Sequence, residues 1–242
     1  ILFSSMYSEL LNLNIDIKFI IDPRLETIFK RSFGDFEFIH QDNLNRIDVL
    51  IKEKYSFIYA GSLGKFFRNN INNFNGKSFF ISNQKKVLEY KSILQKHNFK
   101  KYIGISWKSS SEFMGHKSFN INDFKTLVDM KDYGFINLQY GKIDDLKQYN
   151  LNNEKKIIQI DNLDLFNELD NLVALISCLD YVITSPNITI HLAGAIGKEC
   201  FALYHTEYDS IFNSISDKKN EWYENLKVIQ FNNDLKLKIE NL

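Results

Sequence analysis

Apolar runs and helix-period segments alternate along the whole chain. Runs that are apolar at successive positions, such as 102–107, 135–140 and 181–184, predict strands that are buried on both faces. Between them, segments such as 121–130 and 163–178 carry apolar residues at three- and four-residue spacing, which predicts amphipathic helices. This alternation is typical of parallel α/β units and not of a sandwich or a helical bundle.

The expected elements fall into two halves that meet near residue 99. In the first half, Asp22 and Pro23 have the residue types of an N-cap and a first helical position, so a helix is expected after them. The pattern there predicts a helix over 2–13, strands over 15–21, 36–40 and 57–60, a loop at 61–64 and a helix over 84–97. In the second half it predicts strands over 102–107, 135–140, 156–160, 181–184 and 200–204, and helices over 121–130, 143–149, 163–178 and 187–196.

We therefore predict two doubly wound, Rossmann-like α/β domains. The first covers residues 1–98 and the second covers residues 99–242, with the last helix packing back on the first domain.

Composition and charge narrow the class of protein. The chain has 242 residues, of which 44% are hydrophobic and 25% charged, so it can bury a core and is not a disordered or fibrous chain. Its 30 basic and 30 acidic side chains cancel, which removes the electrostatic footprint that nucleic-acid binding needs. Asp170 and Asp180 enclose the longest apolar stretch, 172–179, which is too short to span a membrane. No transmembrane segment is expected.

Cys178 and Cys200 lie in apolar surroundings and lack the spacing of a disulfide framework or a zinc site. Neither a metal nor a bound cofactor is expected, and a reducing, cytoplasmic location fits best. The chain does not begin with methionine, and we expect it to be a fragment of a longer protein.

In open α/β sheets ligands bind beyond the carboxyl ends of the strands, so the candidate site lies in the loops there. All four arginines are in the first half, so an anion site in the second half must use lysine, hydroxyls, backbone amides or helix ends. After the strand at 102–107, Lys108, Ser109 and Lys117 could hold a phosphate, although a solvated serine turn explains them equally well. At the end of the strand at 135–140, Gln139 and Tyr140 could read and stack on a nucleobase, although a plain turn is the favoured interpretation.

The third loop carries the strongest signal. A buried strand stops at Thr184, and Asn187 is placed as the N-cap of a helix whose first amides and dipole would favour a diphosphate. Thr189 lies at the start of that helix and His191 one turn in, within reach of the same ligand. A histidine satisfied in the core is the ordinary alternative for His191. The small residues 193–195 are expected where this helix presses on the sheet.

Several ordered motifs resemble the donor-binding domain of the heptosyltransferase-like glycosyltransferases (family nine), in the branch often fused behind tetratricopeptide repeats. In the second half these are 103–108 (IGISWK), 137–141 (NLQYG), 170–180 (DNLVALISCLD) and 191–194 (HLAG). In the first half 22–25 (DPRL), 31–33 (RSF), 61–63 (GSL) and Arg68 follow in the same order.

The resemblance implies a GT-B fold, in which two Rossmann-like domains face each other across a cleft, and an inverting, metal-independent sugar transfer from a nucleotide-sugar. By position, Lys108, Ser109 and Lys117 would lie near the phosphates, Gln139 and Tyr140 near the nucleoside, and Asn187, Thr189 and His191 at the diphosphate. The acceptor would be a glycan, a lipid-linked molecule or a protein, as in cell-surface glycan biosynthesis. The full-length protein would carry tetratricopeptide repeats upstream.

Two departures from the family pattern bear on activity. The first strand, its glycine-rich loop and the catalytic base are expected before Ile1, so the first domain would be incomplete. Pro186 also stands where relatives often have an acid, and Lys108 where they have arginine. Two alternatives to the transferase therefore stay open: a nucleotide-binding or partner-binding module without activity, and a nucleotide-sugar epimerase of similar architecture.

Overall fold

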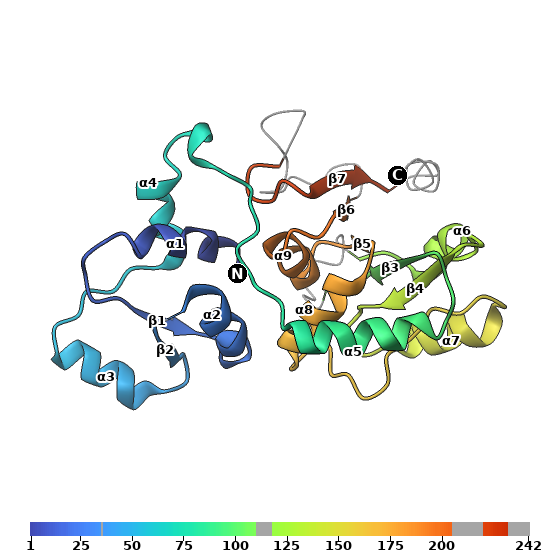
Figure 1. The fold of residues 1–242 in the computed structure, drawn as a ribbon, viewed down its shortest axis with the longest axis horizontal. Helices are drawn as coiled ribbons and strands as arrows, with labels where there is room; N and C mark the ends of the chain where they lie inside the picture. Colours follow the sequence, from blue (N-terminus) through green and yellow to red (C-terminus); the bar gives the residue numbers. More distant parts are fainter. Residues whose placement is uncertain (35, 110–117, 205–219, 232–242) are drawn as a thin grey trace.

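Two parallel β-sheets organise the chain in the computed structural model, which describes residues 1–34, 36–109, 118–204 and 220–231 (Figure 1). The smaller sheet pairs β1 (Lys18–Ile21) with β2 (Glu37–His40). The larger sheet has the order β4-β3-β5-β6-β7 and is parallel throughout. Its strands are β3 (Lys101–Ser106), β4 (Tyr133–Asn137), β5 (Tyr181–Thr184), β6 (Cys200–Tyr204) and β7 (Leu226–Gln230).

The larger sheet has the topology of a dinucleotide-binding fold. Ile158 forms a single parallel bridge to Ile136 on the outer side of β4, so it takes the place of a further edge strand. Counted in chain order with this bridge, the sheet reads 3-2-1-4-5-6, and the connections change direction between β3 and β5. The doubly wound prediction for the second half is confirmed.

Helices cover both faces of this sheet, because its strand residues are apolar on both sides. Ile183 belongs to the cluster under α6 (Lys125–Val128) and α7 (Asp144–Asn152), whereas Val182 belongs to the cluster under α8 (Leu169–Cys178) and α9 (Ile188–Ala195). α5 (Gln84–Gln95), which is expected in the first half, packs along α8 (Figure 1).

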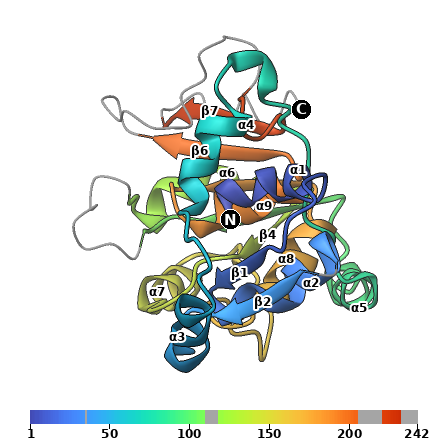
Figure 2. The same cartoon turned by 90° about the vertical axis from the view of Figure 1, so that its left-hand side faces the viewer.

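The first half surrounds β1 and β2 with short helices (Figure 2). Asp22 caps as expected, since its Oδ1 accepts a hydrogen bond from the Arg24 amide at 2.9 Å. An aromatic cluster that includes Tyr7, Phe19 and Phe29 is continuous with the apolar layer under α8 and α9. The helices here are η1 (Leu2–Met6), α1 (Tyr7–Leu10), η2 (Pro23–Leu25), α2 (Glu26–Phe33), α3 (Leu44–Lys52), η3 (Ala60–Leu63), α4 (Gly64–Phe67) and η4 (Ile71–Asn73), where η marks a 3-10 helix.

The prediction of a strand over 57–60 is wrong. Phe57, Ile58 and Tyr59 pair with no strand among the described residues, and their side chains are 53%, 57% and 88% exposed. A strand exists only where a neighbour takes its backbone hydrogen bonds, and here β1 is paired with β2 alone. The loop expected at 61–64 is largely helical, as η3 and the start of α4.

Other boundaries shift for local reasons. The helix expected over 163–178 begins at Leu169, because the Asp164 side chain accepts the amides of Phe166 and Asn167 in a preceding turn. The strand expected over 156–160 is reduced to the bridge at Ile158, and β7 is not predicted from the sequence. The helix expected over 121–130 is η6 (Ile121–Phe124) followed by α6. The expected last helix falls partly on 232–242, outside the described residues.

Within the described ranges, the helices are all too short or too polar to cross a lipid bilayer.

Candidate functional site

The carboxyl ends of β3 and β5 lie side by side at the point where the sheet connections change direction. Ser106, the last residue of β3, is the register partner of Thr184, the last residue of β5. In an open α/β sheet this is the edge where ligands bind. The loops that begin here carry several of the residues singled out in the sequence.

Gln139 ties the loop after β4 to the end of β3. Its Oε1 accepts hydrogen bonds from Ser106 Oγ at 3.1 Å, from the Trp107 amide at 3.0 Å and from the Lys108 amide at 2.7 Å. Its Nε2 donates to the Tyr140 carbonyl at 3.0 Å. The side chain is only 3% exposed, so Gln139 shapes the loop from within.

Asn187 connects the start of α9 to the same loop. Its Oδ1 accepts the Thr189 amide at 2.8 Å, which confirms the expected N-cap. Its Nδ2 donates to Ser106 Oγ at 2.8 Å, to the Lys108 carbonyl at 3.1 Å and to Ser185 Oγ at 3.3 Å. One side chain therefore caps the helix and fixes the backbone of Lys108 beside it.

The first turn of α9 retains donors that no described residue uses. The Ile188 amide has no partner within the described ranges, whereas the Ile190 amide bonds to the Asn187 carbonyl at 3.3 Å. Thr189 Oγ1 is buried and also has no partner there. The Ile188 amide can therefore donate to a ligand oxygen, whereas the Thr189 hydroxyl has no solvent exposure and is out of a ligand's reach in this conformation. The helix dipole at this end favours an anion.

Lys108 provides a cation at this edge. Its ammonium forms an ion pair with Asp145, whose Oδ2 also accepts the indole Nε1–H of Trp107 at 2.7 Å. Burial alone would raise the pKa of Asp145, but hydrogen bonds from Lys108 and Trp107 outweigh it and hold the pKa below its ordinary value. Asp145 is thus a carboxylate at neutral pH. Ser109 follows, with its amide donating to Ser118 Oγ at 3.2 Å.

Tyr140 lies at the border with the first half. The centroids of the Tyr140 and Phe166 rings are 5.9 Å apart, and the Arg24 guanidinium carbon lies 4.7 Å from the centroid of the Phe166 ring. Arg24 Nη1 also donates to the Phe166 carbonyl at 3.1 Å. An aromatic surface and a cation from the first half therefore meet beside the loop after β4.

His191 contacts a buried tyrosine. Its Nδ1 lies 3.1 Å from the hydroxyl of Tyr223, and burial lowers its pKa to about 4, so the ring is neutral at pH 7. The Tyr223 ring sits on Gly194, where an added Cβ would be 2.4 Å from a ring carbon. The small run 193–195 thus accommodates an aromatic side chain at Gly194, an approach that the sequence interpretation assigned to the sheet.

The structure brings Lys108, Ser109, Gln139 and Asn187 together at one edge, with Thr189 in the adjoining turn. Tyr140 and His191 lie to either side of this group, and Lys117 is outside the described residues. Sequence reasoning missed Asp145 as the partner of Lys108 and Tyr223 as the partner of His191. The signal for Asp145 is its place in the first turn of a helix that follows the strand end, where a carboxylate is favoured.

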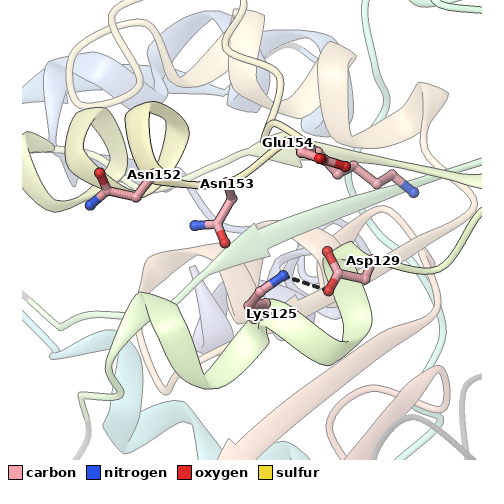
Figure 3. A pocket seen from close by; sticks show the side chains of 6 residues that line it. Lys125, Asp129, Asn152, Asn153 and Glu154 are labelled. Carbon is pink, nitrogen blue, oxygen red and sulfur yellow. Dashed lines mark hydrogen bonds and ion pairs between the residues drawn. The ribbon is translucent and has the colours of Figure 1, made fainter.

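A shallow depression at the opposite edge of the sheet has a different character. Lys125, Asp129, Asn152, Asn153, Glu154 and Lys155 line it, and Lys125 forms an ion pair with Asp129 (Figure 3). These residues belong to α6, to the end of α7 and to the segments that directly follow the two helices, away from the carboxyl ends of the strands. The described ranges hold no group of three or more metal-ligating side chains.

Comparison with known proteins places the fold among glycosyltransferases. No family model matches the chain. Protein FlbA of Caulobacter vibrioides is 25% identical in an alignment 223 residues long, which covers 86% of this chain and 36% of that protein. The chain therefore spans about a third of the length of this relative.

Two solved structures are similar in three dimensions. The glycosyl transferase family 9 structure from Veillonella parvula has a TM-score of 0.62 and 14% identity, and covers 99% of this chain and 87% of that one. The E. coli ADP-heptose lps heptosyltransferase II has a TM-score of 0.43 and 19% identity, and covers 62% and 44%. The Veillonella likeness confirms the GT-B-like, two-domain Rossmann fold that the sequence resemblance implied.

Proposed function

We propose that the chain is the nucleotide-sugar-binding part of a glycosyltransferase that moves a sugar to a glycan, lipid-linked or protein acceptor, with inversion and without a metal. The observation that carries this proposal is the meeting of Lys108 with the unsatisfied first turn of α9 at the switch point of the larger sheet. The fold shared with a family 9 glycosyl transferase supports it.

In the proposed reaction an acceptor group attacks the anomeric carbon and loses its proton to a base, while the bond from that carbon to the diphosphate oxygen breaks. Negative charge therefore grows on the leaving diphosphate. The Ile188 amide at the start of α9 and the Lys108 ammonium would stabilise that charge, as a helix-end donor and as a cation. Thr189 would shape this turn, because its amide bonds to Asn187 and its hydroxyl is buried. Lys117 would add a second ammonium. His191, neutral at pH 7, would contribute hydrogen bonds and no charge. The Tyr140 ring would contact the nucleoside, and Gln139 would hold the loops in place.

Calorimetric titration of the chain with ADP, GDP, UDP and CDP tests this proposal. Saturable binding of at least one nucleoside diphosphate is expected. Asn187→Asp should weaken it by roughly tenfold or more, because the variant keeps the helix cap but loses the Nδ2 donors and places a negative charge beside the phosphate.

Asn83 offers a matched control. It caps α5 through its Oδ1, which accepts the amides of Lys85 and Lys86, and it is remote from the switch point. Asn83→Asp should leave nucleotide affinity unchanged. Binding of none of the four nucleotides, or equal loss in both variants, would overturn the proposal.

A further inference from the structure

Lys108 is held at three atoms by three different parts of the chain. Its amide donates to Gln139 and its carbonyl accepts from Asn187, at 2.7 and 3.1 Å. Its ammonium pairs with Asp145. The first two contacts fix the backbone next to the N-cap of α9, and the third fixes the end of a flexible four-carbon side chain.

Asp145 is itself anchored independently of Lys108. The buried Trp107 donates its indole N–H to Asp145 Oδ2 at 2.7 Å, and the Leu146 amide donates to Oδ1 at 3.1 Å. Asp145 also lies in the first turn of α7, where the helix dipole stabilises a carboxylate. The charge that meets Lys108 therefore occupies a defined position.

We propose that Asp145 is a positioning residue that holds the Lys108 ammonium toward the diphosphate of a bound nucleotide. This inference rests on the proposed nucleotide-binding function and goes beyond it, because Asp145 carries the same charge as the ligand. A carboxylate close to a phosphate weakens anion binding by Coulomb repulsion. A positioning role therefore requires that ordering the lysine outweighs that repulsion.

The two effects have opposite signs, and Asp145→Asn separates them. Repulsion alone predicts that this variant binds a nucleoside diphosphate more tightly than the native chain. Positioning predicts binding that is roughly three- to tenfold weaker, because the freed lysine must be ordered by the ligand. The amide side chain still accepts the Trp107 hydrogen bond, so the loop is retained.

The measurement is calorimetry with whichever of ADP, GDP, UDP and CDP binds the native chain. Asp145→Asn in a Lys108→Met background should no longer weaken binding, because the lysine to be positioned is absent. Asp129→Asn is the matched control, since it removes the carboxylate of another Asp–Lys pair, at the depression in Figure 3. It should leave the affinity unchanged.

Tryptophan fluorescence gives a second readout. The chain has two tryptophans, so Trp222→Phe leaves Trp107 as the only tryptophan, which selective excitation separates from the tyrosines. Nucleotide addition should change Trp107 emission, and less so in Asp145→Asn. If Asp145→Asn unfolds, Asp145→Glu keeps the charge and should bind nearly as well as the native chain, unlike Lys108→Met.

The outcomes distinguish the two proposals. Absence of nucleotide binding by the native chain overturns both. Native binding together with unchanged or tighter binding in Asp145→Asn overturns only the positioning role. An equal weakening by Asp145→Asn with and without Lys108 also overturns it, since the effect then does not pass through the lysine.

Discussion

The two sheets differ in how completely their strands are buried. β3, β4 and β5 are buried without a break after their first residues, whereas β1 alternates and leaves Ile20 exposed, and β2 begins with an exposed Glu37. Helices cover both faces of the larger sheet, whereas the smaller sheet has two strands among the described residues. The polar residues of the candidate site gather on the better buried sheet. A rigid scaffold of this kind positions side chains more accurately than a half-exposed one.

The same contrast holds for side chains on the surface. Most of the large apolar side chains that are exposed in the described ranges belong to the first 71 residues. They are Phe3, Leu11, Leu13, Ile15, Ile20, Leu44, Val49, Ile51, Phe57, Ile58, Tyr59, Phe66 and Ile71. Burial of apolar surface is the main source of stability, so these side chains contribute less than their counterparts in the larger sheet.

The largest expected effect compares one phenylalanine from each half. Phe135 in β4 is completely buried, so Phe135→Ala should lower the free energy of unfolding by about 3–5 kcal/mol. Phe57→Ala removes the same atoms from a side chain that is half exposed. It should change the free energy of unfolding by less than about 0.5 kcal/mol. Urea unfolding followed by circular dichroism measures both. Equal losses would show that 57–60 is buried in solution and would remove the contrast.

The elements that sequence predicts well are those whose cause is local. The β5 strand has the expected bounds, and α9 begins as expected after Asn187, because an apolar run, a proline and a capping side chain follow one another directly. The run at 57–60 has the same apolar character and is not a strand. Its outcome depends on a partner strand, which the local pattern does not encode.

The candidate site divides in the same way. The N-cap role of Asn187 follows from residue type and position, and it is confirmed. The contacts of Gln139 and Asp145 with the loop after β3 join residues more than 30 positions apart. They arise from the order of β4 and β3 in the sheet, so they could be found only from the fold.

Asp170 joins the two halves and should have the next largest effect. It lies in α8, is nearly buried, and pairs with Arg31 of α2 and with Lys86 of α5, the latter at 3.0 Å. Asp170→Ala leaves two partly buried cations without a carboxylate, although Arg31 keeps its hydrogen bond to the Ile81 carbonyl, and should cost about 2–3 kcal/mol in urea unfolding. Asp129→Ala breaks an exposed pair and should cost less than about 0.5 kcal/mol. A cost below 1 kcal/mol at Asp170 would mean that the apolar cluster alone holds the halves together.

Protonation of His191 should have the smallest effect on the free energy of unfolding, and only at acidic pH. Its pKa in the folded chain, about 4, is below the ordinary value of about 6.5, because burial disfavours the charged ring. The unfolded chain therefore binds a proton first as the pH falls, and stability is lost between about pH 6.5 and pH 4, by roughly 1–3 kcal/mol.

His191→Gln removes this titration while keeping a polar group that can reach Tyr223. The difference in unfolding free energy between pH 7 and pH 4.5 should be smaller in this variant than in the native chain. His40, in β2 of the smaller sheet, is the matched control: it is more exposed and pairs with Glu26 at 2.7 Å. If His191→Gln loses as much unfolding free energy between pH 7 and pH 4.5 as the native chain, protonation of His191 is not the cause of the acid destabilisation.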